Sequence, residues 1–361
     1  MFDLKVIIIG GGIAGLAAAL ALKKNKYQVV VREKKSFYNN SGMAFMIHSK
    51  TINEIHSLTD TELDLTNSKV NNFILEGNKN KHNRIELKEW HAFKRIKILH
   101  FLHSQLTDDE YYDNSDFSHF EYKAGEAVAA IFKDGSIEYG DLFIGADGIN
   151  SKVRNSVCKA QFFQNEINEI VCISKHKDKN THDSTFKKYL SIKKGMSFGF
   201  IPISENEYVW FLQFDSKLYN SIFQKSSEIE NDINSKLLSE FPKEIKELIG
   251  NSDLKKAHLW KNKELKLLSS YHKANICLIG DAAHGSISLT SSGVSSGISS
   301  GIKLAQVLNS SESLKSALEE YEKARKEKNA QTIKYAQRLK LQFNKKLIDI
   351  DNYYLPLFHK P

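Results

Sequence analysis

Cysteine and proline are both scarce in this sequence. The three cysteines (Cys158, Cys172 and Cys277) are odd in number and far apart, so they form neither a disulfide framework nor a zinc-binding knuckle. Four prolines in 361 residues leave no proline-rich linker between domains. This usage is typical of a reducing compartment, and we expect a cytoplasmic protein. The pair His100 and His103 has no third ligand at motif spacing, so we expect no metal site.

Clustered charge and long apolar runs are also missing. The net charge of +8 comes mostly from lysines spread along the chain, so we expect no nucleic-acid partner. The apolar stretch Val6–Leu22 contains four glycines and is too short to span a membrane comfortably. The mixed charge of the C-terminal stretch favours a solvated packing helix over a contact with a membrane surface. We expect a monomer or homodimer without stable membrane insertion.

The amino-terminal residues have the pattern of a β-α-β unit. Lys5–Ile9 predicts a buried parallel strand, Leu16–Lys24 an Ala/Leu-rich helix, and Tyr27–Val31 a second strand. Between the first strand and the helix, Gly10–Gly15 reads Gly-Gly-Gly-Ile-Ala-Gly and satisfies G-x-G-x-x-G. The acid Glu33 follows the second strand. In this context the pattern predicts a turn that binds a dinucleotide.

Each part of this turn has a physical role in that hypothesis. Gly10 permits the tight turn, Gly12 lets a pyrophosphate approach the backbone, and Gly15 lets helix and strand pack closely. The helix amino terminus presents free N–H groups to the phosphates, and Glu33 accepts hydrogen bonds from a ribose. The predicted contacts are Gly10, Gly12, Ile13, Ala14, Gly15, Glu33 and Lys34. The alternative is a glycine turn that binds nothing.

The rest of the chain leaves this nucleotide layer and later returns to it. A hairpin is predicted across an Asp-Gly turn within residues 127–139, and alternation over Ile170–Phe214 predicts an antiparallel sheet. A buried strand is predicted over Asn275–Gly280. Further strands are expected at 70–75, 84–90 and 142–144, and helices at 51–58, 95–106, 227–248, 297–308 and 314–349.

Two later segments place an aspartate directly after a strand. Asp141–Arg154 (DLFIGADGINSKVR) closely resembles the "DG" motif, and Ile276–His284 (ICLIGDAAH) the "GD" motif, of class A flavoprotein monooxygenases, the p-hydroxybenzoate hydroxylase family. Arg95 and the helix after it resemble the family's R-x-x-L helix. Tyr321–Arg325 resembles its closing Y-E-x-x-R helix. The motifs stand in the family's order along the chain.

The resemblance implies FAD as the cofactor. It places Arg95 near the flavin and makes Asp147 a further contact. Asp281 can accept a hydrogen bond from a ribityl hydroxyl. The Gly/Ser stretch 285–297 then enters a helix, and Gly293 and Val294 are the positions best placed for N–H groups that stabilise negative charge on the reduced flavin ring. Two alternatives are that Asp281 is only a helix N-cap and that Asp147 is only a turn residue.

The implied fold is α/β: a Rossmann-like FAD-binding domain with a mostly parallel sheet, an inserted antiparallel-sheet substrate domain, and a C-terminal helix. The predicted division assigns 1–69, 91–169 and 270–310 to the FAD-binding domain, 70–90 and 170–269 to the substrate domain, and 311–361 to the C-terminal helix and tail.

The sequence departs from the family around the flavin ring. Ser288 stands in place of a proline, and Ser300 in place of an aspartate. Ser292 belongs to the segment that replaces the family's usual Gly-Gln-Gly. The family's arginine between the ribose-binding acid and the next glycine loop is missing. The loop Gly42–His48 resembles that of tetracycline-modifying members, with Met46 where they tend to have an acid.

The reaction that the resemblance implies is a monooxygenation. NAD(P)H reduces the flavin, dioxygen adds to form a flavin C4a-hydroperoxide, and one oxygen atom passes to a small aromatic or polycyclic substrate. Phe198, Phe200 and Trp210 are our candidates for the substrate pocket, with ordinary core packing as the alternative. The rival functions are a flavin-dependent halogenase, a geranylgeranyl-reductase-like flavoenzyme, a plain NAD-dependent dehydrogenase, and a flavin-binding protein without monooxygenase turnover.

Overall fold

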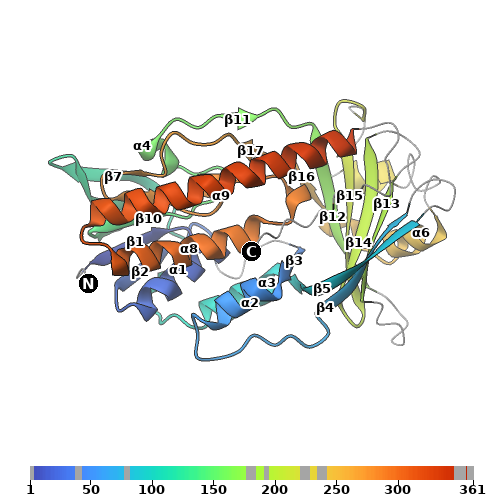
Figure 1. The fold of residues 1–361 in the computed structure, drawn as a ribbon, viewed down its shortest axis with the longest axis horizontal. Coiled ribbons are helices and arrows are strands. Elements are labelled where there is room, and N and C mark those ends of the chain that lie inside the picture. The colour runs from blue at the N-terminus through green and yellow to red at the C-terminus, as the bar shows by residue number, and fades with distance from the viewer. Residues whose placement is uncertain are drawn as a thin grey trace.

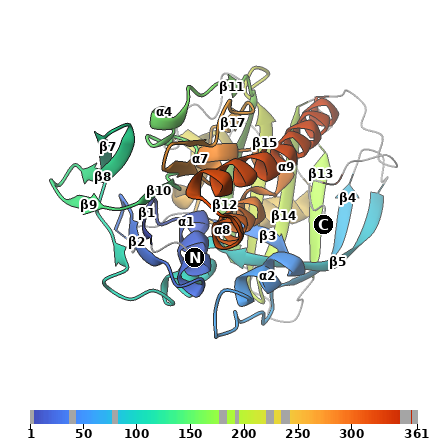
Figure 2. The same ribbon diagram turned by 60° about the vertical axis from the view of Figure 1, so that its left-hand side comes forward.

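The structure, a computed structural model, describes residues 4–36, 43–76, 82–175, 184–190, 195–219, 228–233, 242–344 and 355. Two layered parts lie side by side along the long axis (Figure 1). One part is built on a mostly parallel sheet that packs against helices. The other is built on a large, mostly antiparallel sheet. The long helix α9 (Leu314–Phe343) extends from the first part toward the second (Figures 1 and 2).

The first sheet has six strands in the order β18, β19, β10, β1, β2, β6. Its central strand β1 (Lys5–Ile9) pairs in parallel with β2 (Gln28–Arg32) and β10 (Leu142–Gly145), and β10 pairs in parallel with β19 (Ile276–Leu278). The edge strands are β6 (Tyr111–Tyr112) and β18 (His272–Lys273). The run Val-Ile-Ile-Ile of β1 is buried throughout, as expected for a parallel strand covered on both faces.

Helix α1 (Ile13–Lys24) follows β1 directly, which confirms the predicted strand–helix–strand unit. Helix α8 (Gly293–Ser310) packs closely against α1, because a Cβ on Gly301 would lie only 2.6 Å from the Cα of Ala18. A three-stranded sheet covers one side of this part, and the predicted hairpin lies within it. Its strands are β7 (Phe117–Lys123), β8 (Glu126–Phe132) and β9 (Ile137–Tyr139).

The second sheet has eight strands in the order β16, β12, β15, β14, β13, β4, β5, β3. Its neighbours are antiparallel except for the parallel pair β13 and β4. Their bounds are β3 Ala44–His48, β4 Lys69–Glu76, β5 His82–Lys94, β12 Ile167–Lys175, β13 Thr185–Leu190, β14 Met196–Ser204, β15 Glu207–Asp215 and β16 His258–Trp260. The antiparallel pairing predicted within residues 170–214 is confirmed.

The region read from the sequence as a loop at Gly42–His48 is partly a strand. Ala44–His48 is β3, which pairs with β5 at the edge of the eight-stranded sheet. The apolar sequence Ala-Phe-Met-Ile explains this, since Met46 and Ile47 are both buried. β3 lies within the range 1–69 that the sequence assigns to the nucleotide part, but its hydrogen bonds belong to the other sheet. Residue 42 lies outside the described residues.

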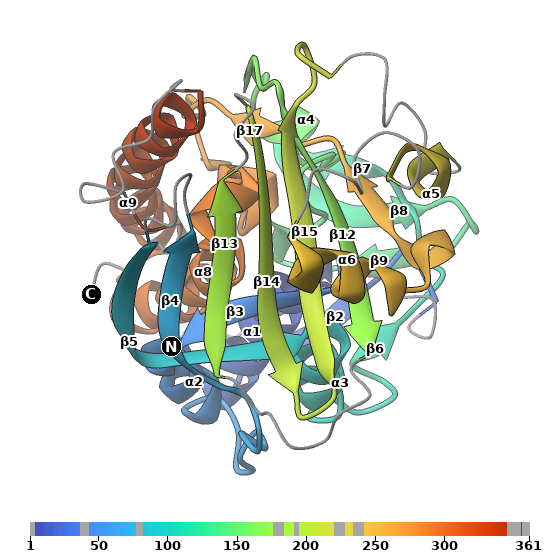
Figure 3. The same cartoon turned by 90° about the vertical axis from the view of Figure 1, so that its right-hand side faces the viewer.

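The eight-stranded sheet has two different faces. We call the outer face the one that packs on the short helices α5 (Ile229–Asp232) and α6 (Lys243–Gly250) (Figure 3). We call the inner face the opposite one, which carries Val171, Ile201 and Val209 and a separate apolar cluster. Because side chains alternate along a strand, every second residue belongs to each face.

The remaining elements are short. They are α2 (Ser49–His56), α3 (Arg95–His103), α4 (Arg154–Val157), β11 (Phe162–Phe163), a 3₁₀ turn (Leu254–Lys256), β17 (Glu264–Leu265), α7 (Asp281–His284) and a second 3₁₀ turn (Ser288–Thr290). Of the helix predicted over 227–248, the structure describes α5 and α6, with Pro242 as the N-cap of α6; residues 234–241 lie outside the described ranges. Within those ranges no helix combines the length and apolar character needed to cross a membrane.

Candidate functional site

The glycine turn between β1 and α1 has the geometry that the sequence predicts. Gly10 has φ of +115°, and a Cβ there would lie 2.4 Å from the carbonyl oxygen of Ala146. A Cβ on Gly15 would lie 1.9 Å from the carbonyl oxygen of Gly10. Gly12 is different: it is the N-cap of α1, and the nearest atom to its Cβ position is Nη2 of Arg95, 3.9 Å away. The space in front of the helix amino terminus is therefore open.

Glu33 is held against this turn. Its Oε2 accepts a hydrogen bond of 2.7 Å from the backbone N–H of Gly11, and its Oε1 accepts one of 3.0 Å from the N–H of Lys35. Tyr111 also lies against Gly11, where a Cβ would meet the Tyr111 ring at 2.8 Å. Sequence analysis missed Tyr111, because β6 joins β2 from 79 residues further along the chain. Lys34 is exposed beside Glu33.

Arg95 begins α3 and brings positive charge to the turn. Its guanidinium interacts with the carboxylates of Glu33 and Asp281, which partly offset the lowering of its pKa by desolvation. Glu33 follows β2 and Asp281 follows β19. Three segments that are far apart in the chain therefore bring one positive and two negative side chains close together. The R-x-x-L helix thus begins beside the glycine turn.

Asp281 is the first residue of α7, and its side chain caps no helix. Asp281 as a whole is exposed. The surrounding protein nevertheless desolvates its carboxylate and raises the pKa of that group, and the charge of Arg95 partly opposes this rise. No described residue donates a hydrogen bond to this carboxylate. A Cβ on Gly293, at the start of α8, would have Oδ1 of Asp281 as its nearest atom, at 3.9 Å. The N-cap alternative therefore does not describe Asp281.

The two carboxylate oxygens of Asp147 differ: one accepts hydrogen bonds within its turn, and the other has no described partner. Oδ2 accepts hydrogen bonds from the backbone N–H groups of Lys152 and Val153, at 2.7 and 3.2 Å, so the turn role exists. Oδ1 is buried and no described group donates to it. A buried carboxylate oxygen without a donor is costly, which points to a donor on a bound molecule.

The start of α8 is open to a ligand. Gly293 is exposed and Val294 half-buried, and the N-cap Ser292 is buried against Thr290, with 2.8 Å between their hydroxyl oxygens. Ser291 has a left-handed backbone with φ of +49°, which permits the sharp entry into the helix. An 18-residue helix carries partial positive charge at this end.

His284 has a structural role. It is buried, and its Nε2 lies 2.8 Å from Oγ of Ser300 while its Nδ1 lies 3.3 Å from Oγ of Ser296. Ser300 donates to the carbonyl of Ser296 and Arg325 donates to Oγ of Ser296, so the network assigns the proton to Nε2. Desolvation lowers the pKa of His284 to about 3. Ser300, which replaces the family's aspartate, is compatible with this neutral histidine.

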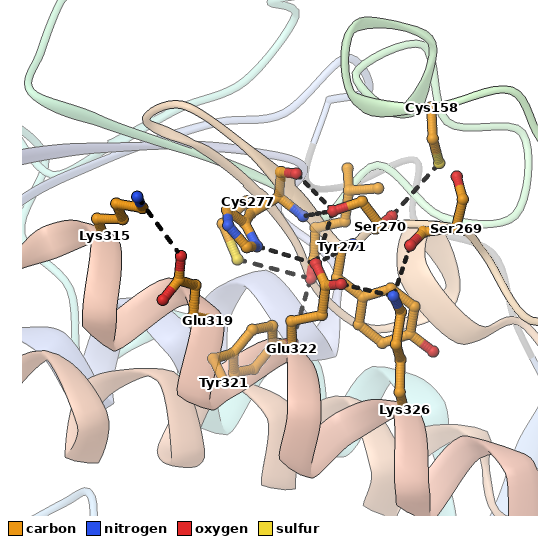
Figure 4. Close-up of polar contacts among 12 residues, drawn as sticks. Cys158, Ser269, Ser270, Tyr271, Cys277, Lys315, Glu319, Tyr321, Glu322 and Lys326 are labelled. Atoms are coloured by element: carbon orange, nitrogen blue, oxygen red, sulfur yellow. Dashed lines mark hydrogen bonds and ion pairs between the residues drawn. The ribbon is translucent and has the colours of Figure 1, made fainter.

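The closing motif on α9 locks the helix to the nucleotide part (Figure 4). Glu322 accepts hydrogen bonds from Oγ of Ser270 at 2.6 Å, the backbone N–H of Tyr271 at 2.8 Å and Nζ of Lys326 at 2.5 Å. Tyr321 is fully buried and donates to the carbonyl of Leu278, the last residue of β19. The motif therefore fixes the strand that precedes Asp281.

The structure corrects the predicted substrate residues. Phe198, Phe200 and Trp210 are buried on the outer face, where they pack among themselves and against α5 and α6. Trp210 also donates from Nε1 to Oγ of Ser252. These three residues therefore belong to the core, which was the alternative. Alternation along a strand separates two faces, but it does not tell which face is turned toward the nucleotide part.

The inner face carries a different set of residues, which sequence analysis missed. Phe211 is half-buried there. Glu169, Lys188 and Gln213 form a buried polar chain across β12, β13 and β15. The glutamate also accepts a hydrogen bond of 3.2 Å from Oγ of Ser288, in the segment between Asp281 and Gly293. Among the described residues no group of three or more acidic, histidine or cysteine side chains is placed to hold a metal.

This arrangement is typical of a dinucleotide-binding protein, with a glycine turn after β1 and aspartates after β10 and β19. The family described as FAD binding domain matches residues 3–336. Because that match spans most of the chain, the protein belongs to the FAD binding domain family, and FAD is its cofactor.

Known relatives agree with this family. The chain is 29% identical over 174 residues to the chloroplastic zeaxanthin epoxidase of Nicotiana plumbaginifolia, covering 43% of this chain and 26% of the epoxidase. It is 24% identical over 347 residues to Monooxygenase 2 of Arabidopsis thaliana, covering 88% and 80% of the two chains. The crystal structure of Klebsiella pneumoniae HpxO, complexed with FAD and uric acid, has the same fold, with a TM-score of 0.84, 18% identity and coverage of 96% and 90%.

Proposed function

We propose that this protein is an FAD-dependent, NAD(P)H-consuming monooxygenase that inserts one atom of dioxygen into a small aromatic or polycyclic molecule. The observation that carries the proposal is Asp281: its carboxylate has no donor among the described residues and lies beside Arg95 and the open start of α8. Three free cysteines support a reducing, cytoplasmic setting.

The residues around the glycine turn are placed to hold the adenosine diphosphate half of FAD. Gly12 leaves room for the pyrophosphate, and the N–H groups of Ile13 and Ala14 stand at the positive end of α1. Arg95 adds a full positive charge there, and Glu33 offers its carboxylate to the ribose. Gly10 and Gly15 bring strand and helix close enough to make this opening, with Lys34 at its exposed rim.

The remaining contacts are placed to hold the flavin half. Asp147 offers its free Oδ1, and Asp281 offers both oxygens to the hydroxyls of the ribityl chain. Gly293 and Val294 present the positive end of α8, which stabilises negative charge on a reduced ring. FAD, when bound, supplies the redox and oxygen chemistry. The chain's own tasks are to orient the ring, exclude water and set the field around it.

The test begins with the absorbance spectrum of the purified protein, which we expect to show bound flavin. NAD(P)H oxidation is then measured with a panel of aromatic compounds, and products formed under isotopically labelled dioxygen are analysed by mass spectrometry. Substrate-stimulated oxidation with one labelled oxygen in the product supports the proposal.

Other outcomes separate the rival functions. Halogenated product, or activity only with externally reduced flavin, indicates a halogenase. Reduction of an isoprenoid double bond without oxygen uptake indicates a geranylgeranyl-reductase-like enzyme. Flavin-loaded protein that never accelerates NAD(P)H oxidation indicates a binding protein without turnover, and protein that binds no flavin contradicts the whole assignment.

A further inference from the structure

The inner face of the eight-stranded sheet carries a buried polar chain beside its apolar cluster. Nζ of Lys188 donates to Oε1 of Gln213 at 2.8 Å, and Nε2 of Gln213 donates to Oε2 of Glu169 at 2.7 Å. Ser197 also donates to Oε1 of Gln213, at 3.2 Å. These residues come from β13, β15, β12 and β14, so the chain crosses four strands on the face that is turned toward the nucleotide part.

One end of this chain carries unused hydrogen-bonding capacity. Lys188 is only 1% exposed. Its ammonium group has three N–H donors. Among the described residues only Gln213 accepts one of them. A buried ammonium without acceptors is costly. Desolvation lowers the pKa of Lys188 to about 8, although the charge of Glu169 acts in the opposite direction.

The other end of the chain reaches the segment that carries the flavin motif. Glu169 accepts from Oγ of Ser288, and the backbone N–H of Ser288 donates to Oδ1 of Asn262 at 3.4 Å. The family's proline at this position could donate neither hydrogen bond. Ser288 lies between Asp281 and Gly293, so the polar chain runs from the flavin end of the site to Lys188.

Aromatic rings flank the ammonium. Nζ of Lys188 lies 6.0 Å from the centroid of the Phe211 ring. Phe211 meets Phe186 edge to face at 5.9 Å, and Phe186 meets Phe73 in the same way at 4.8 Å. Gly199 makes this possible, because a Cβ there would lie 2.3 Å from the Phe211 ring. An aromatic, apolar surface therefore lies next to one buried cation.

We propose that Lys188 is a specificity-determining residue that binds an anionic oxygen on the ring system of the substrate, while Gln213 and Glu169 position it and balance its charge. This inference rests on the proposed function and narrows its substrate class to aromatic molecules with an ionised oxygen. Phe211 supplies the surface for the ring, and Lys188 supplies the two remaining N–H donors.

The test measures the binding of three probes to the flavin-loaded protein without NAD(P)H. The probes are 4-nitrophenol, 4-nitrobenzoate and 4-nitroanisole, which share a ring and offer a phenolate, a carboxylate and no charge. At a pH below the pKa of free 4-nitrophenol, binding as the phenolate produces the phenolate absorbance band. We expect the wild type to bind at least one anionic probe more tightly than 4-nitroanisole, and the anionic probe that binds identifies the kind of oxygen.

The variants isolate the lysine. In Lys188→Met we expect the preference for the anionic probe to fall roughly 10- to 100-fold, the range for a hydrogen bond to a charged group, while Lys188→Arg retains part of it. The double variant Lys188→Met/Glu169→Gln removes both buried charges, so it avoids an uncompensated carboxylate. Lys187→Met is the matched control, since Lys187 points to the outer face and pairs with Glu244 of α6.

Two results would overturn the inference: a wild type with no preference for either anionic probe, or a flavin-loaded Lys188→Met or double variant that keeps the wild-type preference. A purely structural lysine would lower stability in these variants without changing the order of probe affinities. Failure of the proposed function is separate, because it shows as an absence of oxygen insertion in a protein that still discriminates the probes through Lys188.

Discussion

Arg95, Glu33 and Asp281 show how single charged residues define this site. Each follows or begins a different element, and the positive charge of Arg95 acts on both carboxylates. Glu33 is already engaged by backbone N–H groups, so it helps to hold the turn as well as offering a ligand contact. Asp281 accepts from no described residue. A substitution at Asp281 should therefore affect a ligand far more than the fold.

For Asp281→Ala we expect the affinity for FAD to fall about 10- to 100-fold, because a hydrogen bond to a charged group contributes about 1.5–3 kcal/mol. The thermal midpoint of the flavin-free protein should stay near that of the wild type. Flavin titration followed by fluorescence measures the first quantity and a thermal melt the second. Wild-type affinity in the variant would show that the carboxylate does not contact the cofactor.

Gly12→Val tests the opening in front of α1. The nearest side-chain atom lies 3.9 Å from the added Cβ position, so the folded protein has room for valine, but the valine occupies the path of the pyrophosphate. We expect the purified variant to lack flavin absorbance. Gly250→Val is a control, since Gly250 also lies at a helix end with open space around its Cβ position. A yellow Gly12→Val protein would place the cofactor elsewhere.

At the scale of elements, the carboxylate of Glu322 helps to hold α9 against the nucleotide part. Burial alone would raise the pKa of Glu322, but hydrogen bonds from Lys326, Ser270 and the backbone of Tyr271 outweigh burial and lower it to about 2. The ionised form is therefore favoured in the folded state. The stability that this gives is fully present above the ordinary pKa of 4.5 and is lost as the pH falls from there toward 2.

We expect Glu322→Gln to lower the free energy of unfolding at neutral pH by on the order of 3 kcal/mol, and to remove part of the acid sensitivity between pH 4.5 and 2. Glu319→Gln is the matched control one turn earlier, where an exposed carboxylate lies 3.9 Å from Lys315 (Figure 4) and contributes at most about 1 kcal/mol. Denaturant unfolding at several pH values measures both. Equal losses in the two variants would contradict the role given to Glu322.

The same scale shows what the sequence could and could not predict. The β1–α1–β2 unit and its glycines were predictable because their signals are local, and the order of the motifs placed Arg95 and Asp281. The position of the aromatic residues on the inner face was not predictable from alternation. β14 is buried on both faces over Met196–Ile203, so a period of two cannot tell the inner side chains from the outer ones.

The inner polar chain was hidden for a related reason. Lys188 follows another lysine in a lysine-rich sequence and resembles a solvated surface residue. The signal that could have found it is its spacing of two from Phe186, which puts a charge in register with buried aromatic rings. Its partners Gln213 and Glu169 belong to strands that are neighbours only after the sheet has formed.

At the scale of the whole molecule, the two parts meet through α9 and the segment between α7 and α8. Ile167 of β12 packs with Ile287 and Leu289 of that segment and with Ala336 and Leu339 of α9. A ligand that binds between Asp281 and the start of α8 should therefore stabilise both parts together.

We expect saturating FAD, at about 100 times its dissociation constant, to add about 2.7 kcal/mol to the free energy of unfolding and to raise a single cooperative thermal midpoint by on the order of 5 °C. Scanning calorimetry of the flavin-free and flavin-loaded protein measures this. Gly12→Val should show no rise. Two separate transitions, of which FAD shifts only one, would contradict the coupling.

The two faces of the large sheet have a consequence for how this enzyme can change. The aromatic core against α5 and α6 anchors the outer side of the strands. Evolution or a protein engineer can therefore exchange Phe211, or Lys188 together with its charged partner Glu169, while that core stays in place. The outer face then provides much of the stability, and the inner face determines which ligand binds. A library of variants restricted to inner-face positions should therefore yield many folded proteins with altered ligand choice.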